Sequence, residues 1–235
     1  MVLANLIGSG RYDTDKEESG YTSVYEELLR PLLDQDVRLL ELGVFKGGSL
    51  LLWRDYFARG LISGLDLNTP ALDDPSGRIK LFAGRQDDVE LLDRIAAEVA
   101  PDGFDVIIDD CAHLGTVAET SFWHLFRRHL KPGGIYVVED WGTGYWSKWP
   151  DGEAYQTPRP PRRNQLIGLL PTRLRARASR VAGSKRLPSH DAGMVGFVKR
   201  LVDECGRHNL TRYGTESSFE SMMLRTGLVV VRKRR

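Results

Sequence analysis

Short hydrophobic stretches alternate with longer amphipathic segments from Val37 to Asp140. The short stretches contain few polar residues, which is typical of strands buried on both faces of a sheet. In the longer segments the apolar residues recur at helical spacing. The expected strands are 37–42, 61–65, 79–82, 104–108 and 135–138, and the expected helices are 21–33, 49–57, 89–99 and 116–130. This alternation predicts an α/β fold with a doubly wound, mostly parallel sheet.

The flanking segments differ from this pattern. Residues 1–20 are polar and indicate a lead-in loop or short helix, and Lys131-Pro132-Gly133-Gly134 is expected to break the helix before it. Residues 141–191 begin with aromatic residues and become rich in proline and arginine, which suggests a lid over the site or a surface insertion. A helical pattern returns at 192–205, and 221–231 is expected to form two strands around Thr226-Gly227.

Composition narrows the class of protein. The chain has 235 residues, of which 41% are hydrophobic and 28% charged, so one domain is expected. The formal net charge of +1 provides no overall field that would favour nucleic acid or membrane. The two cysteines do not have the spacing of a metal or redox motif, and no apolar run approaches the roughly 18 residues of a membrane span. We therefore expect a cytoplasmic protein, with no membrane or nucleic-acid partner.

The glycine-rich stretch 39–50 indicates a nucleotide-type binding loop. An apolar strand runs into Gly43, and Gly47 and Gly48 precede Ser49, which is expected to cap the next helix. Glycines allow the backbone to approach a ligand closely, and the start of a helix offers free N–H donors. The spacing departs from the dinucleotide fingerprint, whose second glycine would fall at Phe45. Asp66, at the end of the second expected strand, is placed to accept hydrogen bonds from a ribose diol. A nucleoside is therefore better supported than a pyrophosphate.

Acidic residues follow three of the expected strands. They are Asp66, the pair Asp109-Asp110 and the pair Glu139-Asp140. The carboxyl ends of parallel strands share one edge of the sheet, where ligands bind in open α/β folds. Several carboxylates at one edge repel each other unless a cation lies among them, and a hard divalent ion such as Mg²⁺ or Mn²⁺ is suited to oxygen ligands.

Together these motifs resemble the class I S-adenosylmethionine-dependent methyltransferases, and among them the macrocin and macrolide-sugar O-methyltransferases, a group with members labelled cephalosporin hydroxylase. The resemblance covers most of residues 12–148 and, more weakly, 192–231. The matching pieces are Thr14-Asp15-Lys16, ELGVFKGGSL, GLDL, GRQDD, IIDDCAH, LKPGG and VVEDW…GYW. It implies a Rossmann-like, seven-stranded sheet and one methyltransferase domain over residues 1–235.

The resemblance also implies a set of cofactor residues. Glu41 and Gly43 would line the S-adenosylmethionine site, and Asp66 would hold the ribose. Lys16 and Tyr21 would close over the methionine end. The remaining expected cofactor residues are Ser49 near the carboxylate, Gln86 and Asp87 beside the adenine, and Asp109. The plainer alternative for Gln86 and Asp87 is a solvated turn. For Asp109 it is a role in capping a helix or binding a backbone N–H.

The resembled family further implies a metal held by Asp110, Glu139 and Asp140, with His113 as the base. A sugar hydroxyl is a weak nucleophile, and a metal ion with a nearby imidazole would activate it for attack on the sulfonium methyl. Tyr145, Trp146 and His190 are expected to border the substrate. By contrast, His124 and His129 lie in an amphipathic segment and are interpreted as packing residues.

Three classes of function remain open from the sequence. The favoured one is methylation of a sugar or glycoside hydroxyl, with a polysaccharide mannoside as one candidate acceptor and a homodimer as the assembly common in such a family. A catechol- or flavonoid-type O-methyltransferase would share the fold and the metal. The third class, an NAD-binding oxidoreductase or a nucleoside-binding module without catalysis, is disfavoured because the glycine fingerprint is missing and because of the acidic cluster, which hydride transfer does not need.

Overall fold

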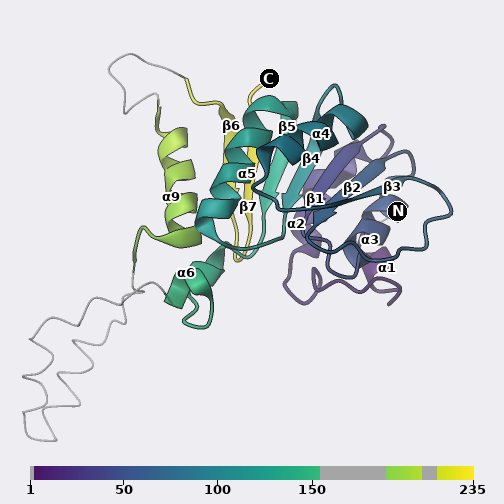
Figure 1. Cartoon of the computed structure of the whole chain (residues 1–235), viewed down its shortest axis with the longest axis horizontal. Helices are drawn as coiled ribbons and strands as arrows, with labels where there is room; N and C mark the ends of the chain where they lie inside the picture. The colour runs from purple at the N-terminus through teal and green to yellow at the C-terminus, as the bar shows by residue number, and fades with distance from the viewer. Residues whose placement is uncertain (1–2, 154–188, 208–215) are drawn as a thin grey trace, which may run out of the picture.

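The computed structural model describes residues 3–153, 189–207 and 216–235, which build one seven-stranded sheet (Figure 1). The strand order is β3-β2-β1-β4-β5-β7-β6. Neighbouring strands from β3 to β5 are parallel, and β7 pairs antiparallel with both β5 and β6. The strands are β1 Arg38–Leu42, β2 Leu61–Asp66, β3 Ile79–Ala83, β4 Phe104–Asp109, β5 Leu130–Val138, β6 Phe219–Leu224 and β7 Val229–Lys233. The predicted α/β class and seven-stranded, mostly parallel sheet are confirmed.

Helices cover both faces of this sheet. One face packs against α1 Leu3–Ile7, α2 Thr22–Leu29 and α3 Gly48–Tyr56 through a core that includes Tyr25 and Trp53. The other packs against α4 Val89–Val99, α5 Gly115–Arg128 and α9 Gly193–Cys205, whose apolar sides meet around Phe122. The short helices are η1 Arg30–Leu32, η2 Trp141–Tyr145 and α6 Pro150–Glu153. In Figure 1 α9 lies toward the left of the molecule, while α1 and α3 lie toward the right.

The strand β1 lies between β2 and β4. The chain first builds β2 and β3 on one side of β1 and then crosses over to build β4 and β5 on the other side. A ligand crevice forms at such a switch point, outside the carboxyl ends of the strands. The loop after β1 and the loop after β4 therefore face each other there. This arrangement brings the glycine-rich stretch next to the acidic residues, as the sequence predicted.

Two local predictions were wrong. The segment Lys131–Gly134 does not break a helix, since α5 ends at Arg128 and β5 already begins at Leu130, which pairs with Phe104. A register shift between Phe104 and Val106 accommodates the proline and glycines. Ser49 is not the helix cap. Gly47 takes that position with φ +83°, a left-handed conformation that favours glycine, and Ser49 lies in the first turn of α3.

The lead-in and the expected lid have different outcomes. Part of 1–20 forms the short helix α1, whose Leu3 is fully buried, so this segment belongs to the core as well as to a loop. Of 141–191, the described residues form η2 and α6, while 154–188 lie outside the described residues. The lid therefore stays a prediction. Among the described residues no helix is long and apolar enough to span a membrane.

Candidate active site

A cavity of about 700 Å³ opens at the carboxyl ends of β1, β2 and β4. Its volume falls within the usual range of small-molecule sites, roughly 300–1,000 Å³. Several lining residues were expected from the sequence to bind a cofactor or metal or to act as the base: Gly43, Ser49, Asp66, Asp110, Asp140 and, as the base, His113. Asp13, Thr14 and Asp15 of the N-terminal segment also line it, as do Phe45 and Leu67. The fold thus brings six of the sixteen predicted site residues to the lining of one cavity.

Asp66 ends β2 and presents a fixed carboxylate to the cavity. Its Oδ2 accepts hydrogen bonds from the backbone N–H groups of Val44 at 2.8 Å and Phe45 at 3.0 Å, and its Oδ1 accepts one from Asn68 at 3.1 Å. Partial burial raises the pKa of Asp66, but these backbone donors outweigh it and hold the pKa below its ordinary value. An ionised acceptor at this position suits the diol of a ribose.

Gly43 allows the loop after β1 to touch the end of β4. Its φ is +91°, and a Cβ atom there would lie 1.9 Å from the backbone oxygen of Asp110. The backbone contact therefore excludes every side chain at this position. As a result, the cofactor-type loop and the acidic residues after β4 form two walls of the same cavity.

Asp110, His113 and Asp140 form a group that can hold a metal ion. Their ligand atoms all lie within 4.8 Å of one another, and the Nε2 atom of His113 is 3.7 Å from Oδ1 of Asp110. Two carboxylates beside an open cavity are suitable ligands for a hard divalent cation. The imidazole offers either a third ligand or a base.

The backbone around this group is strained. Phe45, His113 and Asp140 are the non-glycine residues with positive φ among the described parts of the chain, at +49°, +48° and +51°. All three line the cavity. Such conformations cost free energy and persist where surrounding contacts enforce them, frequently at functional sites. Here the backbone oxygen of His113 accepts hydrogen bonds from Thr143 Oγ1 at 3.3 Å and Trp149 Nε1 at 3.1 Å.

A buried lysine lies beneath the acidic residues. The side chain of Lys16 is 1% exposed, and its ammonium lies 2.7 Å from Glu139 Oε1, 3.1 Å from Asp110 Oδ2 and 3.4 Å from Glu41 Oε1. Burial lowers the pKa of Lys16, but the surrounding carboxylates outweigh it and raise the pKa well above its ordinary value. Lys16 does not line the cavity, so its expected contact with the methionine end of a cofactor stays a prediction.

Glu139 is held from behind by two side chains. Its Oε1 accepts hydrogen bonds from Lys16 and from the hydroxyl of Tyr25 on α2. Burial raises the pKa of this carboxyl to about 8, with the Lys16 charge opposing. Glu139 does not line the cavity, so its expected metal contact stays a prediction. Tyr25 was missed from the sequence because its helical position is that of an ordinary core residue.

Glu41 is a further buried carboxylate beside Lys16. It is fully buried, and within the described residues neither carboxylate oxygen has a hydrogen bond of ordinary geometry. Burial raises its pKa to about 6, while the Lys16 ammonium and the Ser49 hydroxyl oppose the shift. A buried acceptor with this unused capacity fits a site that binds a polar ligand.

Tyr21 positions the second carboxylate of the metal group. Its hydroxyl donates a 2.5 Å hydrogen bond to Asp140 Oδ1. Gly227 in the turn between β6 and β7 packs on this hydroxyl so closely that a Cβ atom would lie 2.0 Å from it. Tyr21 was expected at the methionine end of a cofactor, and the structure adds this bond to Asp140.

The structure does not bring Gln86, Asp87 or Asp109 to the lining of the cavity. The Gln86 amide donates to both oxygens of Asp109 at 3.0 and 3.1 Å, and its carbonyl accepts from the N–H of Ala112 at 2.9 Å. Burial raises the pKa of Asp109 to about 7. Asp87 pairs with Arg85 at 2.8 Å on the surface. Gln86 and Asp109 thus support the loop that carries His113, and their contact with an adenine stays a prediction.

Among the expected substrate residues, Tyr145 ends η2, Trp146 follows it, and His190 precedes α9. None of the three lines the cavity. Tyr145 and His190 meet edge to face with ring centroids 5.1 Å apart, and Trp146 is 55% exposed. Trp149, which was not predicted, lies beside His113, with the two ring centroids 5.8 Å apart. The role of Tyr145, Trp146 and His190 in substrate binding stays a prediction.

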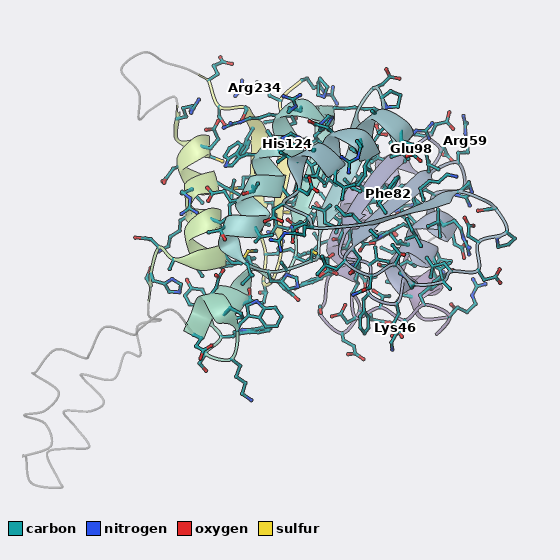
Figure 2. The ribbon with its side chains drawn as sticks, viewed as in Figure 1. Lys46, Arg59, Phe82, Glu98, His124 and Arg234 are labelled. Atoms are coloured by element: carbon teal, nitrogen blue, oxygen red, sulfur yellow. The ribbon has the colours of Figure 1, made fainter. Side chains whose placement is uncertain are left out.

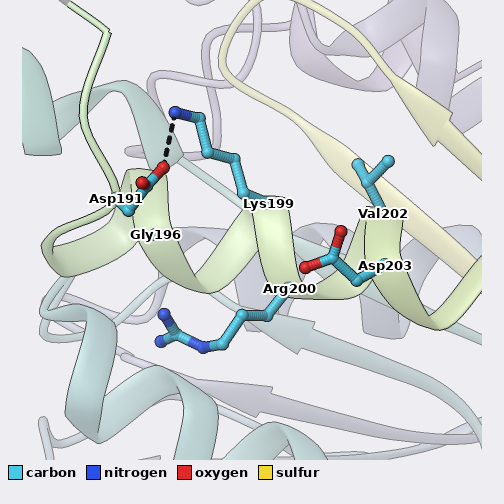
Figure 3. Close-up of a pocket in the computed structure, with 6 residues that line it drawn as sticks. All are labelled: Asp191, Gly196, Lys199, Arg200, Val202 and Asp203. Atoms are coloured by element: carbon cyan, nitrogen blue, oxygen red, sulfur yellow. Dashed lines mark hydrogen bonds and ion pairs between the residues drawn. The ribbon is translucent and has the colours of Figure 1, made fainter.

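A second hollow of about 390 Å³ lies on the outer side of α9 (Figure 3). An ion pair between Lys199 and Asp191, 2.9 Å apart, crosses its edge. Lys199 and Arg200 project from α9 there. None of the predicted site residues lines this hollow, which separates it from the cavity at the strand ends.

The strand order and the cavity define a class, the Rossmann-like methyltransferase fold. A methyltransferase structure from Podospora anserina, bound to SAH, shares this fold with a TM-score of 0.51 and 14% identity, over 100% of this chain and 88% of that one. No protein-family model matches the chain.

Several curated proteins that are similar to the chain are named as O-methyltransferases. The chain is 42% identical over 147 residues to mycinamicin VI 2''-O-methyltransferase of Micromonospora griseorubida, covering 59% of this chain and 36% of that protein. It is 39% identical over 147 residues to demethylmacrocin O-methyltransferase of Streptomyces fradiae, again 59% of this chain and 36% of that protein. The resemblance inferred from the sequence is confirmed.

A solved structure agrees with these relatives. The MycE methyltransferase of the mycinamycin biosynthetic pathway, in complex with Mg, SAH and mycinamycin VI, matches with a TM-score of 0.73 and 30% identity. The match covers 100% of this chain and 54% of that one. The chain thus spans about a third of the length of these curated relatives and about half of the solved structure.

Proposed function

We propose that the protein transfers a methyl group from S-adenosylmethionine to a hydroxyl of a sugar or glycoside, with Mg²⁺ or Mn²⁺ at the strand-end cavity. The observation that carries this proposal is the charge of the cluster. Three carboxylates, those of Glu41, Asp110 and Glu139, surround one ammonium, that of Lys16, and a fourth, that of Asp140, lies beside Asp110. A divalent cation beside Asp110 and Asp140 would offset most of the remaining negative charge.

Asp66 and Gly43 support a nucleoside-type cofactor in the same cavity. The Asp66 carboxylate is ionised and fixed by three backbone donors, which suits two adjacent ribose hydroxyls. Gly43 keeps the backbone of the loop open beside it. Several relatives are named as O-methyltransferases, and MycE is named in complex with Mg and SAH. S-adenosylmethionine is therefore the cofactor proposed here.

His113 is the proposed base. Its imidazole lines the cavity beside Asp110, and Asp110 Oδ1 at 3.7 Å can orient the ring. The bound cation would act as a Lewis acid that makes an acceptor hydroxyl more acidic. The imidazole takes the hydroxyl proton as the oxygen forms a bond to the methyl carbon. The carbon–sulfur bond breaks with its electron pair going to sulfur, which turns the sulfonium into the thioether of S-adenosylhomocysteine. General-base assistance contributes roughly 10²–10⁴-fold.

Asp110 and Asp140 are the proposed metal ligands that face the cavity, with Glu139 completing the set from behind. Because one oxygen of Glu139 already accepts from Lys16 and Tyr25, its other oxygen would be the metal ligand. Tyr145, Trp146 and His190 are proposed to border the acceptor from η2 and the start of α9.

The acceptor class follows from the relatives, which are named for macrolide sugars and, in two cases, for a rhamnosyl group of tetracenomycin. A glycoside is proposed on that basis, with a polysaccharide mannoside as one candidate. A homodimer in the cytoplasm, with no nucleic-acid partner, is proposed for the whole protein.

Two measurements on the purified chain separate the parts of this proposal. Calorimetry should detect binding of S-adenosylhomocysteine and none of NAD, and binding of NAD alone would overturn the cofactor. Mg²⁺ binding should be lost in Asp110→Asn and kept in His113→Ala, while both variants lose turnover. If His113→Ala also loses Mg²⁺ binding, the imidazole is a ligand and the proposed base is wrong. Full turnover of His113→Ala would also exclude it.

A further inference from the structure

Three side chains converge on the outer surface where α4 meets the end of α5. Asp93 lies on α4, His124 on α5, and His129 follows the last residue of α5. The Nε2 atoms of both imidazoles lie beside the same carboxylate oxygen, Asp93 Oδ1, at 2.7 Å for His124 and 2.5 Å for His129. The sequence interpretation of the two histidines as packing residues does not account for this convergence.

We propose that Asp93, His124 and His129 form a second metal site, for a transition-metal ion such as Zn²⁺. Their ligand atoms all lie within 4.8 Å of one another. The site offers two imidazole nitrogens and one carboxylate oxygen. This set of ligand atoms suits Zn²⁺, Ni²⁺ or Cu²⁺, whereas Mg²⁺ prefers oxygen ligands. Three protein ligands leave a fourth position for water.

The geometry needs only a small adjustment. Ligand atoms around a tetrahedral Zn²⁺ ion lie about 3.3 Å apart, since each metal–ligand bond is about 2.0 Å. The Asp93 oxygen is closer than this to both imidazoles, so it must move outward by less than about 1 Å. Its side chain is 41% exposed and can make that movement, while His124 and His129 are 15% and 18% exposed and held more firmly.

The backbone fixes the position of His129. Its N–H donates to the Leu125 oxygen at 2.8 Å, which closes the last turn of α5, and its own oxygen accepts from Phe104 at 2.7 Å. The three proposed metal ligands therefore lie on α4 (Asp93), on α5 (His124) and at His129, whose backbone is hydrogen-bonded to the start of β4. A metal ion here would tie α4 to the connection between α5 and β5, and would stabilise the folded chain because the unfolded chain lacks the arranged ligands.

One neighbouring charge opposes the metal. The Nε atom of Arg128 lies 3.7 Å from Asp93 Oδ1, and its side chain is 64% exposed. A guanidinium at this position competes with a cation for the carboxylate. Since the arginine is on the surface, it can turn into solvent when a metal binds. Removing it should therefore strengthen the site.

This site is separate from the proposed methyl-transfer site. Helix α5 begins at Gly115, beside the cavity loop, and His124 lies about 14 Å further along the helix at 1.5 Å per residue. In Figure 2 His124 appears on the side of the molecule opposite Lys46, which lies in the loop between β1 and α3 that borders the cavity. Loss of one site therefore leaves the other intact.

The test uses Co²⁺ as a coloured substitute for Zn²⁺. Chelator-treated protein is titrated with Co²⁺ in excess Mg²⁺, which occupies the strand-end site. We expect one Co²⁺ per chain, displaced by Zn²⁺, and a melting temperature raised by Zn²⁺. The double variant His124→Gln, His129→Gln should bind at least about tenfold more weakly and lose the thermal shift. The control is Glu98→Gln, which changes an exposed carboxylate on α4, the helix that carries Asp93. It should leave the Co²⁺ affinity and the thermal shift unchanged. The variant Arg128→Gln should bind Co²⁺ more tightly.

Two results would overturn the proposal. One is equal Co²⁺ affinity in the double variant and the unaltered protein. The other is Co²⁺ binding that disappears in Asp110→Asn, which would assign all of it to the strand-end site. Methyl transfer should be unchanged in the double variant, so the outcome is independent of the proposed function.

Discussion

The ammonium of Lys16 lies 2.7 Å from Oε1 of Glu139, with both side chains almost completely buried. The pair joins the N-terminal segment to the end of β5 and lies beneath the cavity. Removing one partner of such a buried pair strongly destabilises the folded protein, because the remaining charge is then buried without an opposite charge beside it. Lys16 is therefore an internal cation that makes the crowded carboxylates compatible with folding.

Replacing Lys16 by methionine should lower the free energy of unfolding by about 3–5 kcal/mol, since it leaves several buried carboxylates without a cation. Urea unfolding at neutral pH measures this. The matched control is Lys46→Met, which removes an exposed pair with Asp13 (Figure 2) and should cost no more than about 1 kcal/mol. Equal loss in the two variants would show that Lys16 does not compensate the buried charges.

Replacing Tyr21 by phenylalanine should weaken Mg²⁺ binding by about 10–100-fold, because the hydroxyl that orients Asp140 is removed. Calorimetric titration of the chelator-treated protein gives the affinity. Tyr12→Phe is the control, since its hydroxyl donates to Asp55 at 2.7 Å outside the cavity. An unchanged Mg²⁺ affinity in Tyr21→Phe would mean that Asp140 does not depend on this bond, or does not bind the metal.

Asp109 should make stability depend on pH. Burial raises its pKa to about 7 in the folded chain, above its ordinary value. The folded state therefore favours the protonated form, and the stability from this group is present at low pH and lost as pH rises through about 7. Relative to the unaltered protein, Asp109→Asn should become more stable between about pH 5 and about pH 8. A stability difference that stays constant over this range, measured by thermal unfolding, would contradict the shifted pKa.

Gly43→Ala should destabilise the chain by about 2 kcal/mol or more, because the position has φ +91° and a Cβ atom would meet the Asp110 backbone. The affinity for S-adenosylhomocysteine should fall with it, since the cavity walls must separate. Gly142→Ala is the control, because a Cβ atom there meets nothing within 4 Å. Thermal unfolding and calorimetry test both effects, and a Gly43→Ala variant as stable as this control would exclude the backbone contact.

Much of the architecture could be predicted because it depends on periodicity. Buried parallel strands and amphipathic helices leave a regular pattern, and strand ends in such a sheet meet at one edge. That reasoning was sufficient to bring Asp66, Asp110 and Asp140 together. The segment after α5 was misjudged because a proline and two glycines inside a strand depend on a bulge in the pairing with β4.

The contacts beneath the cavity could not be read from the chain. Tyr25 reaches Glu139, and Gln86 reaches Ala112, only because segments distant in sequence fold onto one another. A helical tyrosine or a polar turn carries no local mark of such a partner. The meeting of His124 and His129 with Asp93 likewise depends on how α4 packs on α5.

The most direct test of the account is transfer of a labelled methyl group from S-adenosylmethionine to a panel of rhamnosides, mannosides and catechols, with Mg²⁺ and with excess EDTA. We expect label on a glycoside hydroxyl, located by NMR, no turnover in EDTA, and recovery when Mg²⁺ is added back. Full turnover in EDTA would contradict the metal at the strand ends, and label on catechols alone would contradict the sugar acceptor.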